Sequence, residues 1–452
     1  MQDLHRAAYH FQPEGNWMND PNGPVWLKNG LHLFYQYNPF GAAWGNMTWG
    51  HALSPDLLHW KRLSPALRPD QPYDKDGVFS GCCVVKDGLP HILYTGVNPK
   101  QTQCLAVGDA LGEAFEKYPG NPILPEPPVA GMADFRDPYV WKEEDGYHMA
   151  VAGGYKGQGG VVFAYQSDDL VSWRYMGELC RGDDPKNDVW ECPNLLLFPD
   201  GQAQLLLSLI GSSGVYALEG RYAGNRLTPK RALYRYDLGD SYYAPNSFRL
   251  PDGRLITLGW LRETVSGREG SGWQGMMSLL REVSLASDGS VQVRPLKEME
   301  RLRNGRLFTR KNFTVRSGDN PLKGVHGRQL EILLRFEAGA DELLLELAKS
   351  PAGEEKAVVS FDGGSDYLQA DCSKAGGAAA PCGGATAGRG VNELRIFLDG
   401  SALELYLNNQ ETLSTRLYPS REDSDGLRLY ARGAVRILEA QVYRVGSAYE
   451  ED

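Results

Sequence analysis

Three acidic residues have the types needed for acid–base and nucleophilic chemistry: Asp20 in NWMNDPNGPVWL, Asp137 in RDP and Glu191 in WECP. Two carboxylates that flank a glycosidic bond can hydrolyse it, because one protonates the leaving oxygen while the other attacks the sugar or activates water. Read alone, however, Asp20 belongs to a turn of Asn, Asp, Pro and Gly residues, which occur together for conformational reasons. The chemistry therefore requires a fold that brings the three carboxylates together.

Five similar segments in the first three hundred residues indicate such a fold. Each consists of an apolar strand, a turn that ends in Gly and a second apolar strand, which is the pattern of a β-hairpin. The turn glycines recur at intervals of roughly 50 to 60 residues, and helical patterning is almost absent. An all-β chain with this period predicts a five-bladed propeller, whereas a β-sandwich would not explain the regular spacing. The glycines are Gly30, Gly88, Gly146, Gly201 and Gly253.

The innermost strand of each propeller blade lines a central channel, so residues at equivalent positions converge at one end of it. Three carboxylates at one end would repel one another, and a single arginine offsets only one of them, which favours a functional cluster. The alternative is an ordinary ion pair between Arg136 and Asp137, with Glu191 at a solvated strand end. The residues that lie eight to ten positions before their turn glycine are Asp20, Ser80, Arg136, Asp137, Glu191 and Tyr243.

The neighbours of each carboxylate suggest a division of roles. Glu191 stands between Trp190 and Cys192, an apolar setting that would favour its protonated form and the role of general acid. Asp20 lies among turn amides that would stabilise an anion. Asp137 follows an arginine and is also expected to stay ionised.

The aromatic residues suggest a sugar as the ligand. All ten Trp lie between Trp17 and Trp273, and most are expected to fill the blade cores. Trp44, in a Gly-rich loop, and Trp260, directly after a glycine, are the candidates for stacking on a sugar ring. Gln36, close to Trp44 in the sequence, could read hydroxyl groups.

Composition excludes several other classes of function. The 452 residues carry a net charge of −10 with no basic run, so nucleic acid and an anionic membrane surface are poor partners and a neutral ligand is preferred. No apolar stretch approaches the roughly 20 residues of a membrane span. His and Cys do not cluster at zinc spacing, so we expect no metal and no cofactor.

The start MQDLHRAAYHF lacks the apolar core of a signal peptide, which suggests a cytoplasmic protein, or a secreted one if a leader has been removed. The seven cysteines are expected to be mostly reduced. Cys372 and Cys382 flank a loose loop and could pair in an oxidising compartment.

The segments NWMNDPNGP, FSG, RDP, WECP and GWQGMMSLLREV (272–283) together resemble glycoside hydrolase family 32, the invertase and fructan hydrolase family. They occur in the family's order, and the resemblance covers nearly the whole chain. It implies a five-bladed β-propeller followed by a β-sandwich, and retaining hydrolysis of β-fructofuranosyl bonds.

The resemblance also implies roles for individual residues. It makes Asp20 the nucleophile, Asp137 the transition-state stabiliser and Glu191 the acid/base. The predicted substrate-binding residues are Asn19, Gln36, Trp44, Phe79, Ser80, Arg136, Cys192, Tyr243 and Trp260. One departure concerns specificity: Asn194 stands where the family often has an acidic residue after the ECP triplet.

Three functions remain open at this point. The first is a β-fructofuranosidase that acts on sucrose, fructo-oligosaccharides or fructan. The second is a fructosyltransferase, in which a sugar hydroxyl rather than water captures the same intermediate. The third is a fructan-binding propeller without activity, which the three carboxylates argue against.

After a charged segment at 294–307, expected to be a connector or short helix, alternating strands predict a β-sandwich. We divide the chain into a propeller, 1–303, and a sandwich, 304–452. The Gly- and Ala-rich run at 374–390 is expected to be a mobile loop. We expect the role of the sandwich to be packing against the propeller or homo-oligomer formation rather than sugar binding.

Overall fold

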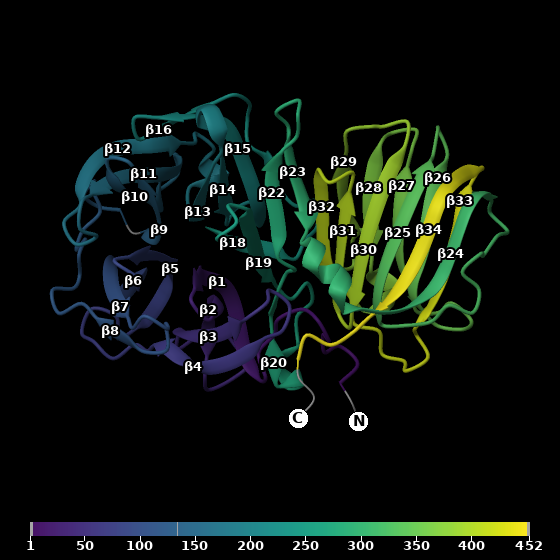
Figure 1. Cartoon of the computed structure of the whole chain (residues 1–452), viewed down its shortest axis with the longest axis horizontal. Coiled ribbons are helices and arrows are strands. Elements are labelled where there is room, and N and C mark those ends of the chain that lie inside the picture. The colour runs from purple at the N-terminus through teal and green to yellow at the C-terminus, as the bar shows by residue number, and fades with distance from the viewer. Residues whose placement is uncertain (1–2, 133, 450–452) are drawn as a thin grey trace.

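The computed structural model describes residues 3–132 and 134–449, which form a ring of blades joined to a sandwich of two sheets (Figure 1). The helices of these residues are short 3₁₀ turns: η1 (Pro185–Asn187), η2 (Pro199–Gly201), η3 (Glu269–Ser271), η4 (Lys297–Leu302) and η5 (Ser373–Ala375). Within the same ranges, no helix has the length and apolar character needed to cross a membrane.

The predicted five-bladed propeller is confirmed: up to Pro295, the described residues form five sheets, antiparallel except where β20 joins β1. Blade I contains β1 (Asn16–Leu27), β2 (Gly30–Asn38), β3 (Thr48–Ser54) and β4 (Lys61–Leu67). Blade II contains β5 (Gly77–Lys86), β6 (Leu89–Asn98), β7 (Lys100–Gly108) and β8 (Phe115–Lys117). Blade III contains β9 (Phe135–Glu143), β10 (Gly146–Tyr155), β11 (Gly159–Ser167) and β12 (Arg174–Arg181).

The last two blades carry short additional strands. Blade IV contains β13 (Trp190–Leu197), β14 (Gln202–Leu209), β15 (Gly214–Ala223), β16 (Arg226–Pro229) and β17 (Tyr234–Arg235). Blade V contains β18 (Tyr242–Arg249), β19 (Leu255–Leu261), β21 (Met276–Met277), β22 (Arg281–Leu285) and β23 (Val291–Pro295). Between β19 and β21 in sequence, β20 (Trp273–Gln274) pairs in parallel with β1. This pairing connects the last part of the propeller to its first blade.

The first two strands of each blade are the hairpins read from the sequence. Gly30 illustrates why the turns need glycine: its φ is +135°, and an added Cβ would lie 2.4 Å from the Ser54 carbonyl oxygen. The five inner strands, β1, β5, β9, β13 and β18, contact one another in order, and β18 contacts β1. This closed ring is what brings residues of all blades to one place.

The sandwich follows η4, next to the predicted division of the chain after residue 303. Its larger sheet, in spatial order, is β24 (Arg303–Val315), β34 (Val435–Val445), β25 (Gln329–Glu337), β30 (Asn392–Asp399), β31 (Ala402–Leu407) and β32 (Glu411–Arg416). The smaller is β29 (Cys382–Ala385), β28 (Tyr367–Asp371), β27 (Ala357–Asp362), β26 (Glu342–Lys349) and β33 (Gly426–Arg432). Leu, Val, Ile and Phe side chains from both sheets form one core.

One expectation for this domain needs correction. The Gly- and Ala-rich run is not simply a loop, since it begins with η5 and contains β29, which pairs with β28 at Ala370 and Cys382. Backbone pairing therefore overrides its low-complexity composition. Cys372 and Cys382 are free thiols in this structure, and their pairing in an oxidising compartment stays a prediction.

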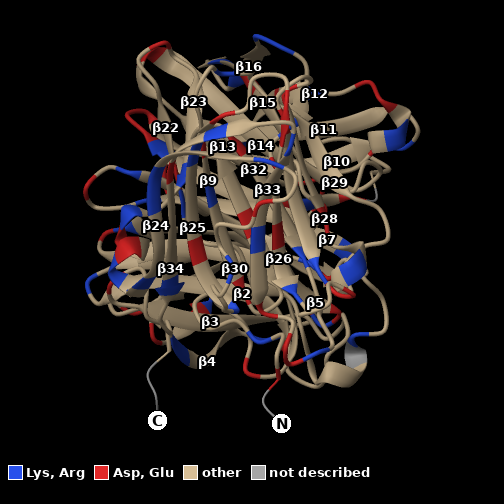
Figure 2. Cartoon of the chain, turned by 90° about the vertical axis from the view of Figure 1, so that its right-hand side faces the viewer, with Lys and Arg blue, Asp and Glu red and all other residues tan. Residues whose placement is uncertain are grey.

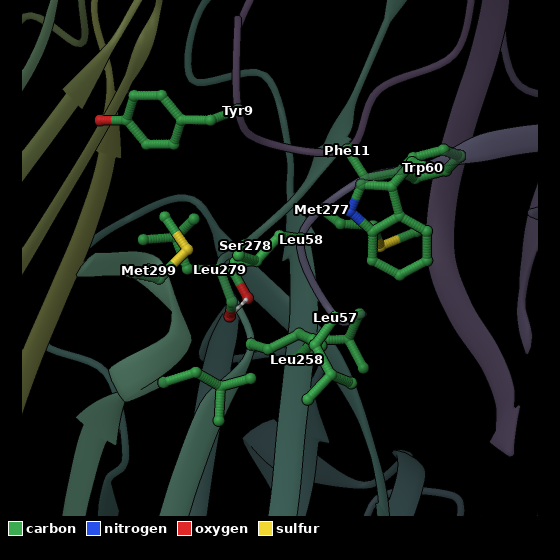
Figure 3. A pocket seen from close by; sticks show the side chains of 12 residues that line it. Tyr9, Phe11, Leu57, Leu58, Trp60, Leu258, Met277, Ser278, Leu279 and Met299 are labelled. Atoms are coloured by element: carbon green, nitrogen blue, oxygen red, sulfur yellow. Dashed lines mark hydrogen bonds between the residues drawn. The ribbon is translucent and has the colours of Figure 1, made fainter. Parts of the chain in front are cut away.

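The N-terminal segment lies between the two domains. Tyr9 and Phe11 pack beside Leu58, Leu279 and other apolar side chains from blades I and V (Figure 3). On the sandwich end of the molecule, acidic and basic residues both occur along the strands and loops (Figure 2).

Candidate active site

A pocket of about 400 Å³ opens where the inner strands of all five blades meet. Its lining includes every predicted site residue except Cys192. The lining residues are Asn19, Asp20, Gln36, Trp44, Met47, Phe79, Ser80, Gln101, Asp134, Arg136, Asp137, Glu191, Tyr243 and Trp260. The alignment on turn glycines therefore identified one structural level correctly, across more than two hundred residues of sequence.

Each inner strand is irregular at the level of the pocket. In β1 the pairing with β2 shifts between Met18 and Pro21, and the other four inner strands shift at the matching place. Such β-bulges redirect side chains. Three of them contain a residue with left-handed φ directly before a proline, which has no N–H to offer the ladder. These residues are Asp137 (φ +63°), Cys192 (φ +48°) and Ala244 (φ +47°).

Asp20 is held by two donors from neighbouring residues of the pocket. Its Oδ2 accepts a hydrogen bond from the Ser80 hydroxyl at 2.6 Å, and its Oδ1 accepts one from the Asn19 side-chain amide at 3.0 Å. Burial nevertheless raises the pKa of Asp20 to about 6. The Ser80 hydrogen bond opposes this shift, and the nearby Glu191 carboxylate adds to it. The expected stabilisation of the anion is present, but desolvation outweighs it.

Asp137 is the more deeply buried of the two aspartates. Its backbone N–H donates to the Thr95 hydroxyl at 3.0 Å, and its Oδ2 accepts from the Cys192 N–H at 2.9 Å. Burial raises its pKa to about 7; the Arg136 guanidinium opposes this shift, while the carboxylates of Glu191 and Asp20 add to it. Arg136 favours the anion as expected, but burial outweighs it, so the pKa of Asp137 lies above its ordinary value.

Arg136 forms its short contacts with other acids. Its Nε and Nη2 donate to Glu191 Oε1 at 3.1 and 2.9 Å, and its Nη1 donates to Asp134 Oδ1 at 2.5 Å. An ordinary Arg136–Asp137 ion pair is thus not what the structure shows. The bulge in β9 turns the two consecutive side chains to different partners.

Glu191 faces polar groups rather than its apolar sequence neighbours. Beyond the two bonds from Arg136, its Oε2 accepts a hydrogen bond from the Tyr243 hydroxyl at 2.7 Å. Burial and the Glu191 charge raise the pKa of Tyr243, so this phenol remains a donor. Successive side chains of a strand point to opposite faces, which is why Trp190 and Cys192 did not describe the surroundings of Glu191.

Cys192 lies behind the carboxylates instead of lining the pocket. Its thiol is 3.5 Å from Asp137 Oδ2 and 3.7 Å from Asp20 Oδ2. Burial and these two acidic neighbours raise the thiol's pKa, so it stays protonated and can donate to either aspartate. The sequence predicts that Cys192 binds substrate, but in the structure its thiol contacts Asp20 and Asp137.

Aromatic side chains form two walls of the pocket. Trp44 is 60% exposed and meets Phe79 edge to face, with ring centroids 6.1 Å apart. Trp260 packs edge to face against Tyr243 at 6.4 Å. Gln36 is buried on the floor and donates to the Val78 carbonyl oxygen at 3.0 Å.

Sequence reasoning missed three lining residues, Met47, Gln101 and Asp134. Asp134 could have been found from its place directly before β9, two residues ahead of Arg136. Gln101 lies in β7 and accepts from the Phe135 N–H at 2.8 Å. No local pattern marks it.

Metal-binding residue types gather elsewhere, at the turn between β9 and β10. Glu143, Asp145 and His148 place ligand atoms within 4.8 Å of one another. His148 already bonds Asp145 and Asn225, at 2.8 and 2.7 Å, so this exposed acidic group is satisfied by the protein itself. The pocket residues that we assign to chemistry are carboxylates, an arginine and hydroxyls.

Comparison with known proteins covers both domains. Residues 10–295 match the glycosyl hydrolases family 32 N-terminal domain, and residues 298–444 match the family 32 C-terminal domain. The chain is 31% identical to a sucrose-6-phosphate hydrolase of Escherichia coli, over 95% of this chain and 93% of that protein. It is 33% identical to a levanase of Bacillus subtilis, over 97% of this chain and 70% of that protein.

A solved structure agrees with this assignment. A mutant of a family 32 β-fructofuranosidase from Bombyx mori, in complex with sucrose, superposes with a TM-score of 0.85 at 27% identity, over 99% of this chain and 95% of that one. The sequence matches, the fold and the order of the motifs all agree with this family. The chain belongs to glycoside hydrolase family 32.

Proposed function

We propose that this chain is a retaining β-fructofuranosidase that releases terminal fructosyl units from sucrose and short fructans that carry no phosphate. The observation that carries the proposal is the joint placement of Asp20, Asp137 and Glu191 in one pocket, with aromatic walls. The relatives support the class of activity, because their names include hydrolases of sucrose 6-phosphate and levan.

In the first step, Asp20 attacks the anomeric carbon of the fructosyl unit while the bond to the leaving oxygen breaks. Glu191 gives its proton to that oxygen, and Asp137 holds the ring while positive charge develops. In the second step, water attacks the anomeric carbon, its proton passes to Glu191, and Asp20 leaves as a carboxylate. Asp20 must be ionised to attack, and a pKa of about 6 leaves it mostly ionised at neutral pH.

The charge of the pocket favours a neutral substrate. Of the described residues that line it, four are acidic, and Arg136 supplies the basic group. Its guanidinium is already bonded to Glu191, Asp134 and Gln101. A phosphate dianion on the leaving sugar would therefore meet net negative charge without an unengaged cation in the lining.

The test compares sucrose with sucrose 6-phosphate, 1-kestose, inulin and levan. We expect kcat/KM to be at least about tenfold lower for sucrose 6-phosphate than for sucrose at low salt, and added salt to narrow the difference by screening. Asp20→Asn serves as the control, and its kcat should fall by several orders of magnitude on every substrate. A preference for the phosphorylated sugar would reject the charge argument, while absence of turnover on the whole panel would reject the activity.

The proposal leaves the fate of the intermediate, the location and the oligomeric state to be tested. Product analysis at high sucrose distinguishes hydrolysis from fructosyl transfer, since transfer yields trisaccharide instead of free fructose. The chain is expected to act in the cytoplasm, or outside the cell if a leader is removed. Light scattering during size exclusion tests a homo-oligomer formed through the sandwich.

A further inference from the structure

The wall beside Glu191 depends on the position of Trp260. The Trp260 ring packs edge to face against Tyr243, whose hydroxyl bonds Glu191 Oε2. On its other side, Trp260 meets Trp17 edge to face, with centroids 5.7 Å apart. A shift of this indole would change the shape of the pocket next to the acid/base candidate.

Gly275 keeps the indole in place from behind. Its φ is +79°, and an added Cβ would lie 2.9 Å from Trp260 Nε1 and 1.9 Å from the Met18 carbonyl oxygen. The backbone at Gly275 is therefore packed between Trp260 and the part of β1 that leads into Asp20. Among the described residues, the contacts that the Trp260 indole makes with Trp17, Tyr243 and Gly275 are packing contacts.

A carboxylate in turn holds Gly275. Glu263 Oε1 accepts the Gly275 N–H at 3.0 Å. The other contacts of Glu263 come from the sandwich: Arg416 Nη1 lies 3.5 Å from Oε1, and the Tyr418 hydroxyl donates to Oε2. One link between the sandwich and the pocket wall thus runs through the Glu263 side chain.

Arg416 also contacts β19, the strand that carries Trp260. It is fully buried, and its Nη1 donates to the carbonyl oxygen of Leu261 at 2.9 Å. Leu261 directly follows Trp260 in β19. Arg416 Nη2 donates to the Ser401 hydroxyl at 2.8 Å, so the guanidinium is anchored in the sandwich while its Nη1 holds β19 of the propeller.

We propose that Arg416 and Tyr418 are positioning residues for the sugar pocket: through Glu263 and Gly275 they hold the Trp260 wall in place. The sandwich then contributes to substrate binding without touching the substrate. This inference rests on the proposed function, because its readout is fructoside turnover. Since the wall contacts the sugar before and during the reaction, its loss should raise KM more than it lowers kcat.

Tyr418→Phe is the mildest test, because it removes one hydroxyl and keeps the ring. We expect KM for sucrose to rise about threefold to tenfold, with kcat within about twofold of wild type. Tyr9→Phe is the matched control: the Tyr9 hydroxyl is also buried between the domains and donates to the Leu398 carbonyl oxygen at 2.9 Å. It has no contact with Glu263, so it should lower Tm without changing KM.

A double-mutant cycle separates positioning from general loosening. If Tyr418 acts through the indole, Tyr418→Phe should raise KM much less in a Trp260→Phe background than in wild type. Equal effects of Tyr418→Phe in both backgrounds, or an unchanged KM for Tyr418→Phe in wild type, would overturn the inference. Arg416→Gln should show the larger effect; where it fails to fold, the tyrosine cycle decides. Failure of wild-type turnover would instead reject the proposed function.

Discussion

At the scale of single residues, the pocket concentrates more negative charge than its one arginine can neutralise. Asp20 and Asp137 respond with raised pKa values, whereas Glu191 takes three hydrogen bonds from Arg136 and Tyr243. The environments of the carboxylates therefore differ although the residues lie in one pocket. Different environments are what allow chemically similar acids to take different roles.

The role of Glu191 can be tested by matching two substitutions. Glu191→Gln should lose nearly all turnover of sucrose but keep much of the first-step rate on an activated aryl fructoside, because a good leaving group needs no proton. Azide should rescue turnover, since it attacks the fructosyl intermediate without a base. The control is Asp134→Asn, which also removes a partner of Arg136. The control should affect both substrates equally, and an equal loss in Glu191→Gln would move the acid/base role to Asp137.

The acid limb of the pH profile should report the nucleophile. With a pKa of about 6, Asp20 is ionised above that pH, so kcat/KM should fall as the pH drops through about 6. Ser80→Ala removes a hydrogen bond to the anion and should move this limb upward by about one pH unit. Ser247→Ala, which removes a buried hydroxyl that donates to Asn194, should leave the limb in place. A limb unchanged by Ser80→Ala would show that another group controls it.

At the scale of strands, the bulges are what turn a repeat into an active site. Each inner strand pairs regularly near its turn glycine and breaks register at the level of the pocket. In blade II the break falls at Gly81, where an added Cβ would lie 2.0 Å from the Leu93 carbonyl oxygen in β6. The strand can only pass there without a side chain.

Gly81→Ala should consequently damage stability and catalysis together. The added methyl must push β5 away from β6, at a cost of about 1–3 kcal/mol for an overpacked site. It should also displace Ser80 from Asp20 and lower kcat. Thermal unfolding and sucrose turnover measure the two effects. Gly318→Ala, where nothing lies within 4 Å of an added Cβ, should change neither, and a fully active, fully stable Gly81→Ala would contradict this account.

The strand pattern also shows how far sequence alone reaches. Period and turn chemistry are local, so the hairpins, the blade number and the level of Asp20, Asp137 and Glu191 could be predicted. Partners across the ring are not local: nothing near Arg136 indicates that it bonds Glu191 instead of Asp137. Nor does any pattern reveal Gln101, which reaches the pocket from a third strand.

At the scale of the whole molecule, buried charges join the domains. Arg281 of blade V bonds Glu404 of the sandwich at 2.8 Å and Asp237 at 2.9 Å. His10 lies between Asp399 and Glu404, with ring nitrogens 2.9 and 3.0 Å from their oxygens. All are essentially inaccessible to water, so separating the domains would leave unpaired charges.

This cluster predicts how stability depends on pH. Burial alone would lower the pKa of His10, but the hydrogen bonds with Asp399 and Glu404 raise it from 6.5 to about 9. The stabilisation is therefore fully present below pH 6.5 and is lost as the pH rises through about 9, a change of about 3 kcal/mol. Tm should fall over this range in wild type, and much less steeply in His10→Gln. Parallel slopes in the two proteins would exclude His10 as the source.

The N-terminal segment between the two domains has a consequence for biosynthesis. The backbone N–H groups of Ala8, Tyr9 and His10 all donate to the carboxylate of Asp399, almost four hundred residues later in the chain. A ribosome that has completed all five blades has not yet made this acceptor or the partner of Arg281 in Glu404. The blades can pair in order of synthesis, but the segment at residues 8–10 cannot dock until Asp399 has been made. We expect nascent chains to remain protease-sensitive near residue 10 until β31, which carries Glu404, has emerged from the ribosome.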